Sequence, residues 1–228
     1  MKTRVFATVL PTVVAALSSS SSLALRRSHT HLKSTTARMM SSSSAEKHVL
    51  VPIGNGSEEI ESVTIIDTLV RGGAKVTVAS VGDTPNVVMS RGVKMTADVL
   101  INECVGKKWD LIALPGGMPG AEHLRDCSDL ISLLEEQNAD NAPIAAMCAA
   151  PAVVLATKGF LNDKTATCYP ADKFRAMLPK ESNDQIVIDR NIITSQGPGD
   201  SLKFALKLVE VLFGMEKSTQ VGKEMLVI

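Results

Sequence analysis

Residues 48–61 read His48-Val-Leu-Val-Pro-Ile-Gly-Asn-Gly-Ser-Glu-Glu-Ile-Glu61, and this stretch decides the fold class. Its first six residues form an almost continuous apolar run, which predicts a buried parallel strand. Glycines then interrupt the run, and Ser57 followed by acidic residues predicts a helix with Ser57 as its N-cap. Gly72-Gly73 ends that helix, whose apolar residues recur at helical spacing: Ile60, Val63, Ile66 and Val70.

The same alternation of strand and helix signals continues to the end of the chain. Further strands are predicted at residues 75–81, 111–114 and 144–147, and a pair of strands at 186–188 and 191–195. Helices are predicted at 130–137, 151–158 and 201–213, and the last of these carries an apolar face of Leu202, Ala205, Leu206, Val209 and Leu212. Strands that alternate with helices predict an α/β fold, a mostly parallel sheet with helices on both faces. Residues 46–228 are expected to form one doubly wound domain.

The formal net charge of zero hides two unlike segments. Residues 1–45 carry six basic residues, no acidic residue and eleven serines, which leaves 18 basic and 24 acidic residues for residues 46–228. Such a serine-rich stretch buries too little apolar area to fold alone. We therefore interpret residues 1–45 as a disordered, cleaved targeting presequence and exclude them from the fold.

The presequence has two parts. Residues 5–17 are an apolar run the size of a signal-peptide core, and Ser22-Leu23-Ala24 offers a cleavage site between small residues. The following stretch is basic, rich in hydroxyl groups and free of acids, like a transit peptide. The combination resembles the bipartite presequence of algae with complex plastids and favours a plastid over a mitochondrion, with simple secretion as a further alternative. An internal start at Met39 or Met40 would give a cytosolic form.

Composition argues against several classes of function. A neutral net charge is atypical of nucleic-acid-binding proteins, and no apolar run reaches the roughly 18 residues of a membrane span. The four cysteines lack the paired CxxC spacing of a zinc site, and no GxGxxG follows a strand. We expect no metal, no nucleotide cofactor, no membrane association and no specific nucleic-acid binding.

Cys148 is the candidate nucleophile. It lies between a predicted strand and a predicted helix in Ile144-Ala-Ala-Met-Cys-Ala-Ala-Pro151, where small neighbours permit a tight, strained turn. Because the sulfur would lie near a helix N-terminus, we expect a thiol pKa below its ordinary value. Four loops follow strand ends and meet at one edge of a parallel sheet, where such folds bind ligands.

The acids Glu58, Glu59 and Glu61 begin the first helix on the same edge. A carboxyl buried beside Cys148 would have a raised pKa and could serve as the general acid and base. Glu58 and Glu61 lie three positions apart and share a helix face, whereas Glu59 points elsewhere. Spacing alone leaves Glu58 and Glu61 as alternatives.

Four motifs in order carry a family resemblance: Gly56-Ser-Glu-Glu-Ile-Glu61, Leu114-Pro-Gly-Gly117, Ala145-Ala-Met-Cys-Ala-Ala-Pro151 and Thr194-Ser-Gln-Gly-Pro-Gly199. Together they resemble the ThiJ/PfpI superfamily, in the branch of the protein deglycase DJ-one and its bacterial ThiJ-like relatives. The resemblance runs from about residue 48 to the C-terminus. It implies a flavodoxin-like doubly wound sandwich that is usually a homodimer.

The resemblance also implies roles for particular residues. Cys148 would be the nucleophile and Glu61 its partner carboxyl, with the backbone N–H groups of Gly117 and Ala149 at the oxyanion. The implied oxyanion and substrate-binding set is Gly116, Gly117, Ala149, Tyr169, Pro198, Arg71 and Arg91, the two arginines near the dimer interface.

The sequence departs from the family pattern at two positions. The peptidase branch has a histidine directly after the nucleophile, and Ala149 stands there, so peptidase activity is not expected. The animal branch has a histidine where Tyr169 stands, and a tyrosine is a poor base near neutral pH because its reference pKa is about 10. His48 and His123 are not placed like the histidine of a Cys-His-Glu triad, which leaves Glu61 as the proton carrier.

The implied function is a glutathione-independent glyoxalase or protein deglycase that needs no cofactor. Its substrates would be methylglyoxal, glyoxal and early glycation adducts of proteins or nucleotides. The alternative is an oxidative-stress sensor or redox-regulated chaperone, because an accessible thiolate also oxidises readily. In that alternative Cys168 could resolve an oxidised Cys148.

Overall fold

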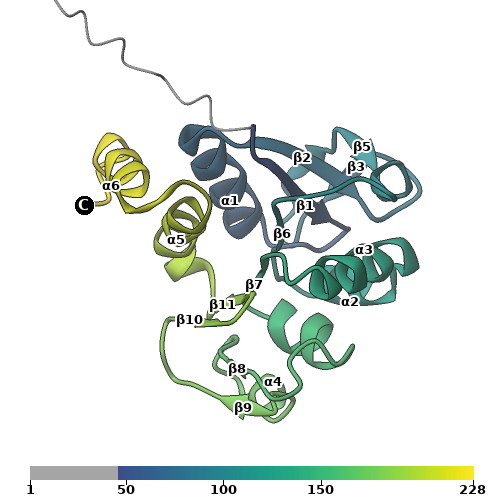
Figure 1. The fold of residues 1–228 in the computed structure, drawn as a ribbon. Coiled ribbons are helices and arrows are strands. Elements are labelled where there is room, and N and C mark those ends of the chain that lie inside the picture. Colours follow the sequence, from purple (N-terminus) through teal and green to yellow (C-terminus); the bar gives the residue numbers. More distant parts are fainter. Residues whose placement is uncertain (1–45) are drawn as a thin grey trace, which may run out of the picture. The chain divides into compact units, whose positions relative to one another are not determined.

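The computed structural model describes residues 46–228, and the interpretation of residues 1–45 as a targeting presequence with internal starts falls outside the described residues. Seven strands form one sheet in the order β10-β11-β7-β6-β1-β2-β5. All neighbours pair in parallel except β10 and β11, which pair antiparallel. The predicted α/β fold with a mostly parallel sheet is confirmed (Figure 1).

The sheet strands are β1 (His48–Ile53), β2 (Lys75–Ser80), β5 (Val99–Leu100), β6 (Leu111–Leu114), β7 (Ile144–Met147), β10 (Ile186–Asp189) and β11 (Ile192–Ser195). Two small two-stranded sheets lie outside it, one of β3 (Asn86–Val88) with β4 (Lys94–Thr96), the other of β8 (Thr165–Ala166) with β9 (Lys180–Glu181). The strands predicted around residues 48, 75, 111, 144, 186 and 191 are all present. The small sheets and β5 were not predicted, because they are too short to show a periodic pattern.

The helices are α1 (Glu59–Gly72), α2 (Gly120–Asp126), α3 (Ser128–Ala139), α4 (Asp172–Arg175), α5 (Ser201–Phe213) and α6 (Met215–Glu224). Three shorter helical segments are η1 (Ile101–Cys104), η2 (Pro151–Ala156) and η3 (Pro198–Asp200). Helices α1, α5 and α6 cover one face of the sheet, and α2, α3 and η2 cover the other (Figure 1). No helix in residues 46–228 is long and apolar enough to span a membrane.

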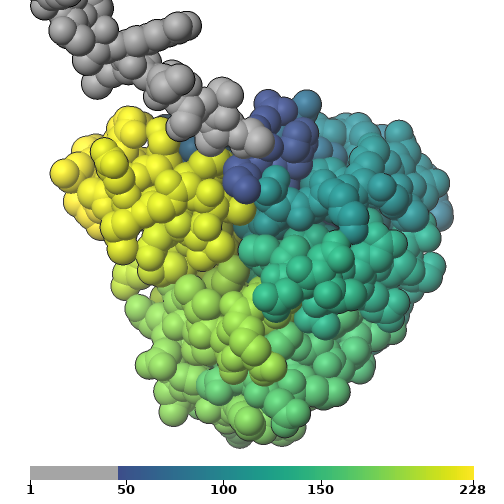
Figure 2. Space-filling view, viewed as in Figure 1, coloured from purple at the N-terminus to yellow at the C-terminus, as the bar shows by residue number. Residues whose placement is uncertain are grey.

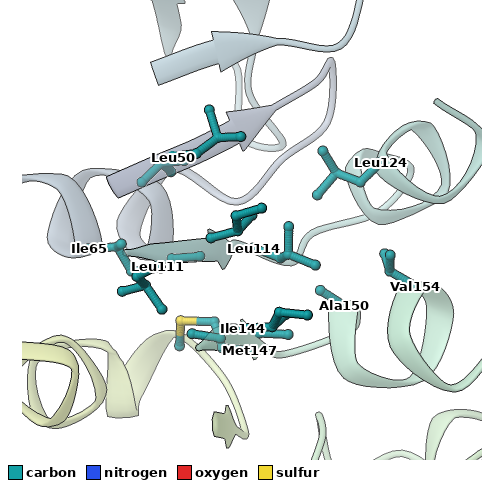
Figure 3. Close-up of a cluster of buried hydrophobic side chains, with 14 of the residues drawn as sticks. Leu50, Ile65, Leu111, Leu114, Leu124, Ile144, Met147, Ala150 and Val154 are labelled. Carbon is teal, nitrogen blue, oxygen red and sulfur yellow. The ribbon is translucent and has the colours of Figure 1, made fainter. Parts of the chain in front are cut away.

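The core is formed where both helix layers meet the sheet. Leu50, Leu111 and Ile144 are fully buried on three neighbouring strands. Figure 3 shows Ile65 reaching the sheet from α1, and Leu124 and Val154 reaching it from helices on the opposite face. Figure 2 shows the dark-blue surface of the start of the described chain close to the yellow surface of its C-terminal part, and α1 contacts both α5 and α6. This two-sided burial holds the strand ends, and therefore the site, in place.

Two details of the helices differ from the predictions. Glu58, not Ser57, caps α1, because the Ser57 hydroxyl accepts the Gly54 amide at 3.0 Å while the Glu58 carboxylate accepts the Glu61 amide at 2.8 Å. The segment predicted as a helix over 151–158 is a π-helix that ends at Ala156. The wider π-turn has no signature in residue spacing, so the pattern could not distinguish it.

The buried face of α1 is also rotated from the one expected, whereas Ala205, Leu206 and Val209 of the face predicted for α5 are buried as expected. On α1 the residues that pack inward are Ser62, Ile65, Thr68 and Leu69, whereas Ile60, Val63 and Val70 remain about half exposed. On α5 Leu202 is exposed, and Phe204 and Leu208 are buried instead. Helix α1 carries apolar residues on two faces, and periodicity cannot say which of them meets the sheet.

Candidate active site

Cys148 occupies a strained turn at the carboxyl end of β7. Its φ of +60° is a left-handed conformation that a residue with a side chain rarely adopts. Two backbone hydrogen bonds hold the turn: the Cys148 amide donates to the Ser195 carbonyl at 3.0 Å, and the Tyr169 amide donates to the Cys148 carbonyl at 2.7 Å. The predicted strained turn at Cys148 is therefore present, and these hydrogen bonds to neighbouring segments fix the direction of the thiol.

Glu61 lies in the first turn of α1 and is fully buried beside Cys148. Its Oε2 atom accepts the Gly116 amide at 2.7 Å. Its Oε1 atom is buried and has no hydrogen-bond partner among the described residues. The two alternatives left by spacing are thereby separated, because Glu58 uses its carboxylate to cap α1 while Glu61 faces the thiol.

The loop after β6 connects these two groups. A Cβ atom on Gly116 would lie 2.6 Å from the Cys148 Cβ, and one on Gly117 would lie 2.5 Å from the Glu58 amide nitrogen. Gly117 also has a φ of +86°. Only glycine permits the loop to approach both α1 and the turn at Cys148 this closely. The Glu58 amide donates to the Gly116 carbonyl at 3.0 Å, which fastens the loop to the helix.

The pKa of Glu61 is raised to about 7. Burial is the main cause, and the negative charge of Glu58 adds to it, while hydrogen bonds from the Gly116 amide and the Cys148 thiol act in the opposite direction. A carboxyl with this pKa changes its protonation state near neutral pH. Glu61 can therefore both accept and donate a proton under ordinary conditions.

The lowered thiol pKa expected for Cys148 is wrong. Burial, followed by the negative charge of Glu61, raises the pKa of Cys148 to about 12, although the amides of Gly117 and Ala149 act to lower it. The prediction counted the helix N-terminus and left out the desolvation of a sulfur that is only 8% exposed. Cys148 rests as a thiol, and Glu61 is the base placed to take its proton.

A cavity of about 340 Å³ opens onto the thiol. Five of the residues expected at the site line it together with Cys148: Arg91, Gly117, Ala149, Tyr169 and Pro198. Glu58, the alternative carboxyl, also lines the cavity, and three further lining residues were not among the candidates: Ser90, Met118 and Phe174. Ser90 and Phe174 show no signal in the sequence pattern, because only the folded loops bring them to the cavity.

Two of the expected residues, Gly116 and Arg71, do not have the positions implied by the resemblance. The Gly116 amide is occupied by Glu61, so Gly116 holds the carboxyl and is not a free oxyanion donor. Arg71 lies at the far end of α1 in an exposed ion pair with Asp67 at 2.8 Å, and it does not line the cavity. The other arginine, Arg91, is at the cavity mouth.

Neither histidine of the described chain reaches this cavity. His48 is at the start of β1, 3.4 Å from Glu46, and His123 Nδ1 is 2.7 Å from the Asn55 carbonyl oxygen. Cys168 is buried, with a pKa raised to about 11 mainly by burial. Residues 46–228 contain no cluster of three metal-ligating side chains. Cys148 thus lines the cavity, and the buried carboxyl beside it is that of Glu61.

Comparison with known proteins identifies the family. The model of the DJ-1/PfpI family matches residues 47–211. Protein DJ-1 homolog B of Arabidopsis thaliana is 45% identical over 179 residues, which are 78% of this chain and 41% of that protein, so the chain spans less than half of this relative. Glutathione-independent glyoxalase DJR-1.2 of Caenorhabditis elegans is 36% identical over 78% of this chain and 96% of its own length.

A solved structure agrees with these matches. The structure of oxidized Toxoplasma gondii DJ-1 superposes with a TM-score of 0.77 at 46% identity, and the match covers 79% of this chain and 98% of that one. The described fold, the match over most of the domain and the ordered motifs at the strand ends agree with one another. The chain belongs to the DJ-1/PfpI family.

Proposed function

We propose that this protein is a glutathione-independent glyoxalase that converts methylglyoxal and glyoxal into α-hydroxy acids. The observation that carries the proposal is the buried Glu61 carboxyl, whose pKa is about 7 and which interacts with the thiol of Cys148. A relative that matches over almost its whole length bears the name glutathione-independent glyoxalase. The same chemistry on early glycation adducts would be protein deglycation.

The first step joins the thiol to the aldehyde. Ionised Glu61 takes the Cys148 proton as the sulfur attacks the aldehyde carbon, and a carbon–sulfur bond forms. The amides of Gly117 and Ala149, which act on the Cys148 sulfur, would donate to the developing oxyanion. Glu61 then returns this proton to the new alkoxide oxygen, so the product of this step is a hemithioacetal on Cys148 and the carboxylate is ionised again.

The second step moves a hydrogen between neighbouring carbons. Glu61 removes the proton from the former aldehyde carbon, which gives an enediol, and returns a proton to the adjacent carbon. The result is a thioester of the α-hydroxy acid, and water hydrolyses it to lactate or glycolate while the thiol is restored. Water is the only co-reactant, and the pKa of about 7 suits a group that must act as base and acid in turn.

The test is lactate formation from methylglyoxal by the purified protein without glutathione, beside Cys148→Ala. The proposal expects lactate from the wild type and none from the variant. Absence of lactate in both, with selective peroxide oxidation of Cys148, would replace the enzyme by the second candidate, a redox sensor or redox-regulated chaperone. The oxidized structure of the Toxoplasma relative supports keeping that candidate.

We also propose that the protein is a homodimer that uses the outer face of α1. Ile60, Val63 and Val70 are 55%, 48% and 54% exposed and lie on a helix that is otherwise packed. Apolar patches of this kind mark protein interfaces. The variant Val63→Asp should elute as a monomer under conditions in which the wild type is a dimer, and a monomeric wild type would end this proposal.

Delivery to a plastid remains a proposal that rests on residues 1–45. A fluorescent reporter fused behind these residues should reach the organelle. A diffuse cytosolic signal would contradict the targeting interpretation altogether.

A further inference from the structure

Arg91 contributes the one positive charge among the side chains that line the catalytic cavity. Five arginines lie in the described part of the chain, and four of them form ion pairs: Arg71 with Asp67, Arg125 with Asp126, Arg175 with Glu181 and Arg190 with Asp189. Arg91 has no such partner within residues 46–228. Among the arginines of residues 46–228, the one without a carboxylate partner is therefore the one that lines the cavity with Cys148.

Glu59 holds Arg91 at the cavity mouth. Its Oε1 accepts the Arg91 amide at 2.7 Å, and its Oε2 accepts the Ser90 hydroxyl at 2.9 Å. This carboxylate therefore binds the Arg91 backbone amide and the Ser90 hydroxyl, and it does not engage the guanidinium. The loop is further held by the Ser90 amide, which donates to the Ser57 carbonyl at 2.8 Å. The arginine thus stands on a loop fastened to the same helix turn that carries Glu61.

The guanidinium has donors to spare. Its Nη1 atom donates to the Ser90 carbonyl at 3.1 Å and to the Ser90 hydroxyl at 3.3 Å. Nε and Nη2 have no hydrogen-bond partner among residues 46–228. A guanidinium presents five N–H donors in a planar fork that matches a carboxylate or phosphate. Two of its three nitrogen atoms are therefore available to a ligand oxyanion.

The negative charges nearby restrict where an anion can bind. Glu58 lines the cavity and has one carboxylate oxygen on the Glu61 amide, and Glu61 is buried behind Cys148. An anion beside Glu58 would be repelled, so the favourable place is the side of the cavity at Arg91. A ligand that reaches both Cys148 and Arg91 carries its reactive carbon and its anionic group at opposite ends.

The size of the cavity leaves room for such a ligand. One water molecule occupies roughly 30 Å³ in the liquid. The cavity of about 340 Å³ therefore has the volume of about eleven water molecules. Methylglyoxal has five non-hydrogen atoms and fills only part of this space. Arg91 lines the same cavity, so a ligand larger than methylglyoxal can contact it there.

We propose that Arg91 is a specificity-determining residue that binds an oxyanion carried by the aldehyde substrate, and that Glu59 is its positioning residue. The preferred substrates are then small aldehydes that bear a carboxylate or a phosphate near the carbonyl. This inference rests on the proposed function, because it concerns what the same thiol attacks.

The test measures binding without turnover. Each probe aldehyde adds reversibly to the Cys148 thiol, whose proton passes to the new alkoxide, and so protects the sulfur from N-ethylmaleimide, as read by intact mass of the full chain. The probes are glyoxylate, glycolaldehyde phosphate and neutral glycolaldehyde. The readout is the probe concentration at which half of Cys148 is protected from alkylation. If binding of the anionic group contributes about 1.4 kcal/mol, an anionic probe reaches this point at a tenfold lower concentration than neutral glycolaldehyde. We expect at least that advantage for one or both anions, and the two show whether carboxylate or phosphate is preferred.

Variants assign the effect to Arg91. Arg91→Gln should remove the advantage of the anions over glycolaldehyde, and Arg91→Lys should restore part of it, because the charge returns without the fork. Arg71→Gln makes the same charge change outside the cavity and should keep the advantage. Equal protection by all three probes in the wild type, or an anion advantage that survives in Arg91→Gln, overturns the proposal. Protection is readable even if no lactate is ever formed, so the two proposals fail separately.

Discussion

Two sides of the first turn of α1 carry carboxylates of opposite character. Glu59 faces the Ser90–Arg91 loop, and although burial acts to raise its pKa, hydrogen bonds from its own amide, the Ser90 hydroxyl and the amides of Arg91 and Val93 lower it. Glu61 faces Cys148, and burial raises its pKa to about 7 because only the Gly116 amide and the thiol oppose that effect. The number of donors around each carboxylate decides whether it is a fixed charge or a proton carrier.

The largest effect should follow from removing the proton carrier. Glu61→Gln keeps the size of the side chain but cannot accept the thiol proton. General acid–base catalysis contributes about 10²–10⁴-fold, so we expect kcat for lactate formation to fall by about three orders of magnitude. Glu59→Gln is the matched control on the other side of the turn and should retain most of kcat. An equal fall of kcat in the two variants would contradict the assignment of Glu61 as proton carrier and Glu59 as fixed charge.

The second effect concerns stability. Glu61 has a pKa of about 7 in the folded protein and 4.5 as its reference value, so the folded state binds more protons between these pH values. Its contribution to stability is present below about pH 4.5 and is lost as the pH rises through 7. The difference in unfolding free energy, Glu61→Gln minus wild type, should therefore increase by roughly 3 kcal/mol at most between pH 4.5 and pH 8. Urea denaturation at both pH values measures this, and a constant difference would contradict the raised pKa.

The third effect is the pH dependence of the thiol. If Glu61 must be ionised to take the proton of Cys148, the alkylation rate of Cys148 follows the ionised fraction of Glu61. With a pKa of about 7 this fraction rises by about two orders of magnitude between pH 5 and pH 8. Iodoacetamide labelling followed by mass spectrometry gives the rate. A rate that is flat over this range would mean that Cys148 is already a thiolate while Glu61 is protonated.

The smallest effect belongs to the fixed charge. Glu59→Gln replaces an ionised acceptor of two hydrogen bonds, at 2.7 and 2.9 Å, by a neutral amide. Hydrogen bonds to charged groups contribute about 1.5–3 kcal/mol to stability. We therefore expect the unfolding free energy of Glu59→Gln at neutral pH to be about 2 kcal/mol below that of the wild type. The loss should shrink as the pH falls and the wild-type carboxylate becomes protonated. A loss that is equally large at pH 4 would assign the effect to packing.

The sequence pattern predicted the strands and the turn at Cys148 because buried parallel strands are apolar runs, and a glycine or an abrupt small-residue segment marks where each ends. It could not separate Glu58 from Glu61, since both lie on one helix face, and the capping bond of Glu58 exists only in the fold. The resemblance assigned the role to Glu61.

Other features depend on the folded environment in the same way. Nothing in the spacing distinguishes Arg71 from Arg91, because only the loop after β3 brings Arg91 to the cavity. The pKa of Cys148 was predicted in the wrong direction for a related reason. Desolvation is set by everything that covers the sulfur, and no local pattern records it.

The positive φ of Cys148 has a meaning for the evolution of this chain. Position 148 is one at which the fold itself favours glycine, since a residue with a side chain held in this region costs about 1–3 kcal/mol. A library of random substitutions at this position, sorted only for thermal stability, should enrich Cys148→Gly above the parent. The same library sorted for activity should return the cysteine. Stability and chemistry thus select different residues at this position.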